Sequence, residues 1–433
     1  MILRNLKIVD LITGSVSEPS DLLIEDGRIK SIDSYKPGPM KEGINVAGMY
    51  ALPGLVNTHA HTAMTLLKGS AEDLSPSDWF NRHIWMYEKN LTPHDVFVGT
   101  LLGAAEMLLN GVTWVADHYF FMEEAFKAYE EAGMRATLCR AVFGTDETAR
   151  QSLEESAAFI RDFGKTSPRI KTCLGPHSPY LCPEDFLKET ARLAEQLQVP
   201  LHIHVSETAA QVAASLAKDG RTPVRVLEDT GILRPGTILA HAYHATDEDL
   251  ELIKKHDCGI AHCAKTYMKF GDLKDFLPRA LDAGVKVGLG TDGPASNNTM
   301  DIFETARLAA LLAKVSTGKA ETAPIRQILP LFFTGGRILG EPAYGTLAPG
   351  APADLVLLSD KSLSFIPREN LPAHLLYSLQ PGDIDTVIVD GEIVVWNGTL
   401  AKIDLDALLE EAASIYRRLA VKDGGKPMQR YNT

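Results

Sequence analysis

The sequence predicts an α/β protein built from a (β/α)8 TIM-type barrel and a small β-sandwich domain formed by both chain ends. Three observations support this fold. Eight short apolar runs in the middle of the chain alternate with helical patterns, both chain ends carry β-type runs joined by turns, and reactive side chains fall at the ends of the apolar runs. The chain has 433 residues, 45% hydrophobic and 23% charged, which is the composition of a globular protein with a large core.

Both chain ends read as β-structure. Residues 22–25 and 29–32 flank Asp26-Gly27, and residues 386–389 and 392–395 flank Asp390-Gly391, so each pair has a hairpin signal between two strand-like runs. Neither end has enough apolar residues to form a core by itself. We therefore expect residues 1–50 and 341–433, the latter ending in a helix, to pair into one β-sandwich domain. Two independent hairpins lying on the large domain are the alternative.

Residues 51–340 are expected to form the barrel, because strand-like and helix-like stretches alternate through them. Amphipathic segments such as residues 183–197 and 246–256 separate the runs, and Thr246 is a suitable cap for the second. The eight strands are predicted at residues 55–61, 112–119, 135–142, 170–177, 199–205, 237–244, 259–265 and 285–292.

The overall composition excludes several classes of partner. Asp and Glu outnumber Lys and Arg by 56 to 43, and the net charge of −13 would repel phosphate backbones and anionic lipid. We therefore expect no nucleic acid and no membrane partner. The five cysteines are scattered without a C-x-x-C motif, as in a reduced cytosolic protein. No apolar run approaches the roughly 18 residues of a membrane span, and charge interrupts the first residues too early for a signal peptide, so a cytoplasmic location is expected.

Side chains that bind metals lie at four of the predicted strand ends. His59 and His61 are two residues apart on the first strand, so both point to the same side. A second H-x-H motif ends at His204, a further histidine lies at His241, and the last run ends at Asp292. Any one of these motifs could arise from histidines packed in the core. Four strands that deliver such residues to one barrel face instead indicate a metal site suited to assisted hydrolysis.

Several segments resemble the amidohydrolase superfamily, and within it the sequence is most similar to the 5-methylthioadenosine/S-adenosylhomocysteine deaminases. The resemblance covers nearly the whole chain and implies a (β/α)8 barrel with a β-sandwich made from both chain ends. The matching segments are residues 53–61 (PGLVNTHAH), 64–69 (MTLLKG), 83–85 (HIW), 175–180 (GPHSPY), His204 with Glu207, His241, and residues 290–298 (GTDGPASNN).

The resemblance implies a metal site with a defined set of ligands. These would be His59, His61, His204 and Asp292, and they would hold one Zn2+ per chain, with Fe2+ or Mn2+ as alternatives.

The resemblance also implies roles for residues around the metal. Glu207 would shuttle protons between the attacking water and a purine ring, His241 would polarise the attacking oxygen or the tetrahedral intermediate, and Asp292 would take the water proton. The residues implied to bind substrate are Glu88, Arg140, Arg150, His177 and Glu207.

The implied function is hydrolytic deamination of an adenosine-type nucleoside, with release of ammonia. The candidate substrates are 5-methylthioadenosine, S-adenosylhomocysteine and adenosine. A deaminase or chlorohydrolase of another aminated heterocycle (guanine, pterin, cytosine or triazine) is the first alternative. A catalytically silent, metal-stabilised binding scaffold is the second. Barrels of this family often associate, so a homo-oligomer is also implied.

Some assignments stay open at this level. His202 points to the same side of its strand as His204 and is an alternative ligand, although a supporting role is favoured because it lies deeper. Substrate contact is open for Trp85, His118, His244 and His262. The motif Gly288-x-Gly290-x-x-Gly293 formally matches the dinucleotide fingerprint, but it follows the last strand and does not open the first βαβ unit.

One stretch departs from the pattern of this family. Relatives usually carry His-Asn-Pro-x-Ser-Asn after the seventh strand, where this chain has the stretch His262-Cys263-Ala264-Lys265-Thr266-Tyr267-Met268-Lys269. The exchange introduces a lysine and a bulky tyrosine at the expected barrel mouth. We therefore expect the metal chemistry to be retained and the shape and charge of the pocket to change.

Overall fold

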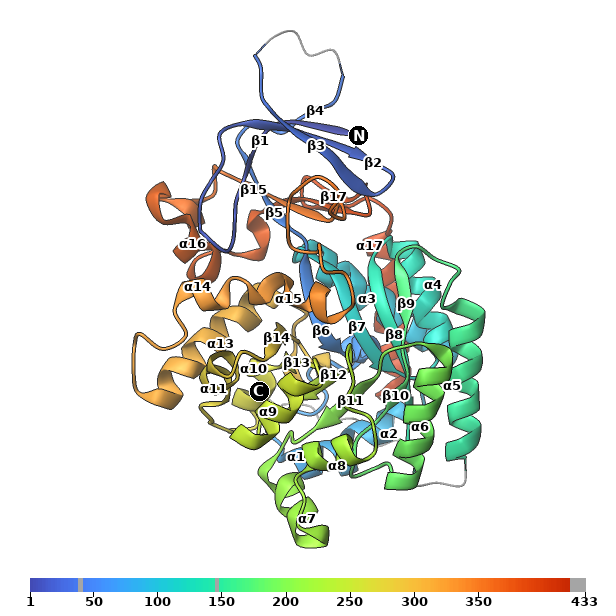
Figure 1. Cartoon of the computed structure of the whole chain (residues 1–433). Helices are drawn as coiled ribbons and strands as arrows, with labels where there is room; N and C mark the ends of the chain where they lie inside the picture. Colours follow the sequence, from blue (N-terminus) through green and yellow to red (C-terminus); the bar gives the residue numbers. More distant parts are fainter. Residues whose placement is uncertain (38–41, 145–147, 421–433) are drawn as a thin grey trace.

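The computed structural model describes residues 1–37, 42–144 and 148–420. A barrel occupies the centre of the molecule, and a sheet made from both chain ends lies against one end of it (Figure 1). Among the described residues, no helix combines the length and the apolar composition that crossing a membrane would require.

All eight predicted runs form parallel strands of the barrel, and the fourth run is divided into two short strands. The strands form two arcs in the orders β10-β8-β7-β6 and β11-β12-β13-β14, with β9 paired to β8. Parallel bridges at Ala60–Asp292 and Leu174–Leu201 join the arcs into a closed barrel. The barrel strands are β6 (Leu55–Ala60), β7 (Val112–Tyr119), β8 (Arg135–Val142), β9 (Ile170–Thr172), β10 (Gly175–Pro176), β11 (His202–Val205), β12 (Ile238–His241), β13 (Gly259–His262) and β14 (Lys286–Leu289).

Helices surround the barrel, and local capping explains where several of them begin. Thr92, Thr208 and Thr246 each accept a hydrogen bond from the backbone three residues on, in a reciprocal capping box. The cap predicted at Thr246 is therefore confirmed. The helices and helical turns are η1 (Thr62–Leu67), α1 (Pro76–Asp78), η2 (Trp79–Ile84), α2 (Trp85–Glu88), α3 (Pro93–Leu109), α4 (Met122–Ala132), α5 (Ala149–Phe163), α6 (Glu184–Leu197), α7 (Ala209–Asp219), α8 (Pro223–Asp229), α9 (Asp247–Lys255), α10 (Ala264–Lys269), α11 (Phe276–Asp282), α12 (Pro294–Asn297), α13 (Ile302–Thr317), α14 (Ile325–Ile328), α15 (Leu331–Ile338), η3 (Leu363–Phe365), η4 (Arg368–Asn370), α16 (Leu371–Tyr377), η5 (Pro381–Asp383) and α17 (Leu405–Leu419).

The strands of both chain ends join in one nine-stranded sheet. Its order is β18-β17-β16-β15-β5-β1-β2-β3, with β4 paired to β1. Because β15 pairs directly with β5, the alternative of two independent hairpins is wrong. The strands are β1 (Ile2–Ile8), β2 (Ser20–Glu25), β3 (Arg28–Ser34), β4 (Ile44–Asn45), β5 (Met49–Pro53), β15 (Leu355–Ser359), β16 (Ile384–Val389), β17 (Glu392–Trp396) and β18 (Thr399–Leu400).

A buried ionic network fastens this sheet to the barrel. Arg135 of β8 contacts Asp354 at 2.9 Å and Asp390 at 2.7 Å, and the Tyr344 hydroxyl donates to Asp354 at 3.0 Å. The side chain of Asp354 is only 1% exposed and that of Arg135 is 12% exposed. Since a charge buried in such a network depends on its partners, each member is needed by the others.

We expect Asp354→Ala to lower the free energy of unfolding by about 3–5 kcal/mol, because Arg135 would stay buried after losing a carboxylate partner. Denaturant unfolding followed by circular dichroism measures this change. Lys30→Ala is the matched control, since it removes the exposed Lys30–Glu25 pair and should have no measurable effect. Unchanged unfolding of the Asp354→Ala protein would contradict the role given to the network.

Candidate active site

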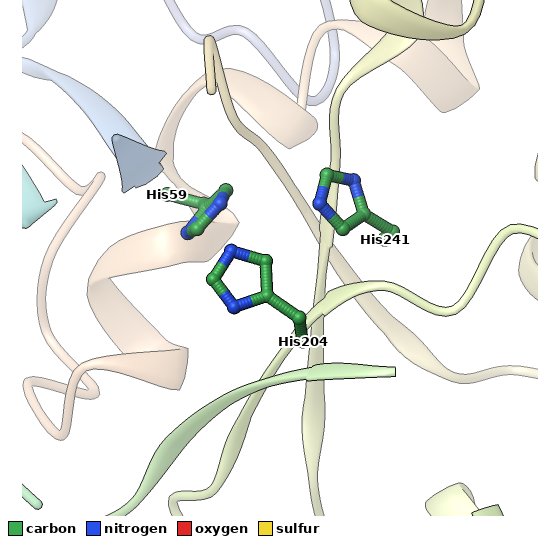
Figure 2. A group of neighbouring side chains, drawn as sticks. All are labelled: His59, His204 and His241. Carbon is green, nitrogen blue, oxygen red and sulfur yellow. The ribbon is translucent and has the colours of Figure 1, made fainter. Parts of the chain in front are cut away.

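Four histidines and one aspartate converge at the carboxyl ends of the barrel strands. His59 lies on β6 with His61 just after it, His204 lies on β11, His241 ends β12, and Asp292 follows β14. The rings of His59, His204 and His241 point toward one another (Figure 2). Candidate ligand atoms lie within 4.8 Å of one another in two overlapping groups, one of these three histidines and one of His59, His61 and Asp292. The structure therefore brings together every predicted metal ligand.

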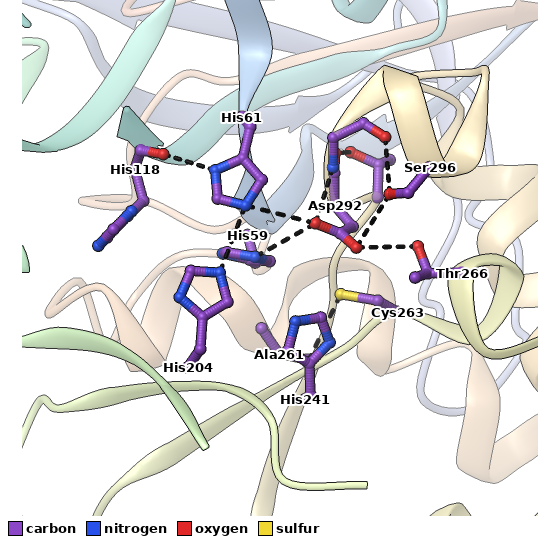
Figure 3. Close-up of polar contacts among 12 residues, drawn as sticks. His59, His61, His118, His204, His241, Ala261, Cys263, Thr266, Asp292 and Ser296 are labelled. Atoms are coloured by element: carbon purple, nitrogen blue, oxygen red, sulfur yellow. Dashed lines mark hydrogen bonds and ion pairs between the residues drawn. The ribbon is translucent and has the colours of Figure 1, made fainter. Parts of the chain in front are cut away.

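Hydrogen bonds on the far side of the rings orient His61 and His204. The Nδ1 of His61 lies 2.5 Å from the carbonyl oxygen of His118, and the Nδ1 of His204 lies 3.0 Å from the carbonyl oxygen of His177. Each Nδ1–H therefore donates to a carbonyl, which leaves Nε2 directed to the common centre (Figure 3). The two Nε2 atoms are 3.3 Å apart.

His202 has a supporting position. Its Nε2 lies 2.9 Å from the Nδ1 of His59, behind the ring and away from the centre. The candidate metal groups among the described residues contain His204 and leave out His202. The geometry therefore favours His204 as the ligand and His202 as the residue that orients His59.

Asp292 is fixed by three hydrogen-bond donors and by the imidazoles of His59 and His61, each with its Nε2 3.5 Å from the Asp292 Oδ1. Its Oδ2 accepts hydrogen bonds from Thr266 at 3.0 Å and Ser296 at 3.1 Å, and its Oδ1 accepts from the Gly293 amide at 2.8 Å (Figure 3). Burial alone would raise the pKa of Asp292, but neighbouring His59 and the other histidines hold it well below its ordinary range, so the group stays ionised.

The chemistry of this donor set fits a divalent metal. Burial lowers the pKa of His59 to about 3 and the pKa of His204 well below its ordinary value, so both rings are neutral, as metal ligands must be. The Nε2 of His59 is buried without a hydrogen-bond partner. A cation at the centre would satisfy this nitrogen, and three imidazoles with one carboxylate suit Zn2+.

The glycines of the Gly288-x-Gly290-x-x-Gly293 motif serve close packing around the site. A Cβ atom at Gly288 would come within 2.4 Å of Thr58, and one at Gly293 within 2.5 Å of Met64. A Cβ at Gly290 would lie 3.1 Å from the Cβ of His59. These glycines let the last strand approach the first strand, so the resemblance to a dinucleotide motif has no functional meaning here.

The predicted catalytic pair lies beside the metal ligands. The Oε1 of Glu207 is 3.8 Å from the Nε2 of His241. The side-chain amide of Gln211 accepts from the backbone amides of Glu207 and Thr208, and its nitrogen lies 3.5 Å from the Oε2 of Glu207. Gln211 thus holds the loop that presents Glu207 to the site.

A pocket of about 520 Å3 opens above the metal ligands. Glu88, His177 and Glu207 line it, as predicted for substrate-binding residues, and so do Trp85 and His118. Burial raises the pKa of Glu88 to about 7, although the adjacent Tyr119 hydroxyl opposes this shift. A carboxyl group near its midpoint at neutral pH can respond to a ligand by changing its protonation.

Two predicted substrate-binding residues lie elsewhere. The guanidinium group of Arg140 contacts Glu155 at 2.6 Å and Glu123 at 3.4 Å. Arg150 is 84% exposed on α5 and lies 3.9 Å from the carboxylate of Glu189. Neither arginine belongs to the described lining of the pocket. The structure therefore does not place these two side chains with Glu88 and His177.

The unusual stretch after β13 contacts Asp292 and does not form the described wall of the pocket. Lys265 turns toward Glu304 at 2.8 Å, and Tyr267 stacks on Tyr243 with a ring separation of 3.8 Å. Thr266 reaches the centre through its bond to Asp292, and the ring of Tyr267 meets that of His241 edge to face at 5.9 Å. Neither Lys265 nor Tyr267 belongs to the described lining, so the expected direct effect of these two side chains on the pocket is not observed.

His244 and His262 make contacts outside the pocket. His244 lies 2.6 Å from the carboxylate of Asp272, and His262 is buried against Phe276. Neither belongs to the lining that the described residues form.

Sequence reasoning missed the aromatic walls of the pocket. A usable signal was present, because Tyr119 ends a predicted strand and Phe120 and Phe143 directly follow strand ends. The other missed residues lie on segments whose course could not be read from strand patterns. The missed aromatic side chains are Trp79, Phe80, Tyr119, Phe120, Phe143, Tyr180 and Phe270.

Comparisons with known proteins give one consistent result. A family model described as the amidohydrolase family matches residues 50–394. The chain is 39% identical over 426 residues to the 5-methylthioadenosine/S-adenosylhomocysteine deaminase of Desulforudis audaxviator, with 97% of this chain and 99% of that protein covered. It is 38% identical over 396 residues to the 5′-deoxyadenosine deaminase of Methanothermobacter thermautotrophicus, covering 90% and 92%. The solved structure of an adenosine deaminase from Xanthomonas campestris with bound zinc matches with a TM-score of 0.90 at 28% identity, covering 96% and 98%.

Metal analysis of the purified protein is expected to find about one divalent ion per chain. His204→Ala should remove this ion, because it deletes a ligand. His202→Gln should weaken metal affinity by about 10–100-fold without abolishing binding, because His202 acts through His59. Chelator competition measures both effects. Retention of the metal by His204→Ala together with its complete loss from His202→Gln would reverse the two assignments.

Proposed function

The chain belongs to the amidohydrolase family, and from this premise we propose that it hydrolyses the amino group from an adenosine-type nucleoside and releases ammonia. One observation carries the proposal: a metal-type centre, the acid–base candidate Glu207 and the ribose-binding candidate Glu88 all face a single pocket. The names of the two deaminase relatives support the same reaction class.

We propose that His59, His61, His204 and Asp292 hold one Zn2+ ion, with Fe2+ or Mn2+ as alternatives. The related adenosine deaminase with bound zinc supports this choice of metal. When bound, such a cation acts as a Lewis acid and lowers the pKa of a coordinated water.

Side chains of the protein carry out the proton transfers. Asp292 accepts a proton from the attacking water, which adds to the carbon that bears the amine. Glu207 protonates the adjacent ring nitrogen, which makes that carbon electrophilic, and His241 donates a hydrogen bond to the oxygen being added. The proton on Asp292 passes to the amino group, which leaves as ammonia. The added hydroxyl becomes the ring carbonyl, and its remaining proton returns to Glu207, which restores the proton that Glu207 gave to the ring nitrogen.

The remaining pocket residues suit the nucleoside part of the substrate. Glu88 can accept hydrogen bonds from both ribose hydroxyls, and His177 lines the same pocket beside Phe143, with ring centroids 4.8 Å apart. Aromatic rings such as Trp79 and Phe270 offer stacking and an apolar environment. We therefore propose 5′-deoxy or 5′-thioether nucleosides as substrates, and the proposal makes no use of Arg140 or Arg150.

An ammonia-release screen tests the reaction and its substrate. Adenosine, 5′-deoxyadenosine, 5-methylthioadenosine and S-adenosylhomocysteine form one set, and adenine, guanine, cytosine, pterins and aminotriazines form the other. Turnover of the second set alone would support the alternative heterocycle hydrolase. Turnover of neither set by metal-loaded protein would support the silent scaffold.

We also propose the division of the chain into domains. Residues 51–340 form the barrel, apart from residues 51–53, which belong to β5 of the sheet, and the nine-stranded sheet folds over its own apolar core as a sandwich. A separate cluster of buried side chains that includes Leu22, Leu355 and Ile388 supports the second unit.

Glu207→Gln is expected to lower kcat by about 10²–10⁴-fold, because the amide can neither give nor take the ring proton. Metal content should stay unchanged, since Glu207 is not among the candidate ligands. Glu195→Gln on the outer face of α6 is the matched control and should behave as the parent. Full activity of Glu207→Gln would remove this residue from the mechanism.

Nucleoside binding is expected to strengthen as pH rises through about 7. Below its pKa of about 7 the free Glu88 carboxyl is protonated, whereas ribose hydroxyls donate to the carboxylate form, so binding releases a proton. Well below pH 7, nucleoside affinity should therefore decrease by about tenfold for each pH unit that the pH is lowered. Well above pH 7, affinity should no longer depend on the protonation of Glu88.

Calorimetry with a purine nucleoside that lacks the amino group, in buffers of different ionisation enthalpy, measures this proton release. Glu88→Gln should abolish it and flatten the pH profile near neutrality. The same proton release from the Glu88→Gln protein would assign it to another group.

A further inference from the structure

One segment supplies much of the pocket wall. Residues 62–88 leave β6 after His61, pass through η1, α1, η2 and α2, and return to α3. Ser75, Trp79, Phe80, Trp85 and Glu88 of this segment all line the pocket. The segment lies outside the barrel strands, so the position of these side chains depends on contacts made by the segment itself.

A three-residue polar cluster ties the segment to the loops that follow the last two barrel strands. The Nζ of Lys269, at the end of α10, lies 2.5 Å from the Oε2 of Glu72. The side-chain nitrogen of Asn298, just after α12, donates to the Oε1 of Glu72 at 2.6 Å, and Lys269 also donates to Asn298. Both oxygens of Glu72 are therefore engaged by residues that follow the seventh and eighth barrel strands.

A second set of contacts joins the same elements. The ring of Trp79 meets the ring of Phe270, the residue after Lys269, edge to face at 6.2 Å. The indole nitrogen of Trp79 lies 3.4 Å from the carbonyl oxygen of Ala295 in α12. The segment is thus held to α10 and α12 at Glu72 and again at Trp79, which itself lines the pocket.

The cluster is shielded enough to be maintained in water. The side chains of Lys269 and Glu72 are 26% and 18% exposed. Lys269 and Glu72 do not line the pocket that the described residues form, and neither belongs to the candidate metal groups. An effect of Glu72 on substrate therefore acts through the segment, and an effect of Lys269 acts through the segment or through the adjoining Phe270.

We propose that Lys269, Glu72 and Asn298 form a latch that positions residues 75–88 over the pocket, and that Lys269 and Glu72 are positioning residues that set nucleoside affinity. The inference rests on the proposed nucleoside substrate. Opening the latch lets Trp79 and Glu88 move away from the bound nucleoside, while the strand-borne metal ligands keep their places.

Glu72→Gln and Lys269→Met test the latch by removing one charge from each side. The KM of the preferred nucleoside should rise by about three- to tenfold, as expected for the loss of a partly shielded ion pair, while kcat changes less than about twofold. Hydrogen–deuterium exchange of residues 70–88 in the free protein should increase in both variants. Lys269→Arg should retain parental KM and exchange.

Lys265→Met is the matched control on the same helix. Lys265 pairs with Glu304 and Thr299, away from the segment, and is 18% exposed. This variant should keep parental KM and exchange. The double exchange Glu72→Lys with Lys269→Glu should recover much of the KM lost in either single exchange, because the opposite charges face each other again.

The proposal fails if both charge-removing variants keep the parental KM and exchange, or if kcat falls while KM and exchange stay unchanged. Asn298→Ala replaces Lys269→Met if the latter does not fold, with the same expected outcome. Hydrogen–deuterium exchange requires no turnover, so it tests the latch even if the parent protein deaminates no nucleoside. Absence of turnover in the parent protein would refute only the proposed function.

Discussion

The parallel bridge between Ala60 and Asp292, where the first and last strands close the barrel, is the contact on which the site depends. The Asp292 amide donates to the carbonyl of His59 at 3.0 Å, so two residues from opposite ends of the barrel domain have a fixed separation. Asp292 and His241 both adopt positive φ values, 62° and 72°, which cost energy for residues other than glycine. The surrounding barrel maintains these strained conformations, which direct both side chains into the centre of the site.

Much of the fold could be predicted because strands and helices leave different periods in a sequence. Alternation on a strand also explains why the metal ligands could be predicted, since His59 and His61 share a side. The same alternation argues against substrate binding by Arg140. Its neighbour Ala141 faces the pocket, so Arg140 faces the surrounding helices, where Glu123 and Glu155 bind it. The positions of the aromatic side chains that line the pocket depend on the paths of loops. Strand and helix periodicity contains little information on those paths.

The electrostatics of the centre follow from how little water reaches it. Burial keeps His59, His177, His202 and His204 neutral. Asp292 stays ionised among them because contacts with neighbouring histidines outweigh the effect of burial on its pKa. Farther out, Glu88 has a pKa near neutrality. One pocket thus contains carboxylates of very different acidity, because each has different neighbours and not because the residue types differ.

The pairing of β5 with β15 also has a consequence for synthesis on the ribosome. Leu355 and Pro53 are partners in this ladder, so the first sheet strands leave the ribosome long before the strand that will lie beside them. Until residues 355–359 are made, β5 has an unpaired edge next to the start of the barrel. An unpaired edge of this kind can join another nascent chain. The sheet can therefore be completed only after residues 355–359 have been made.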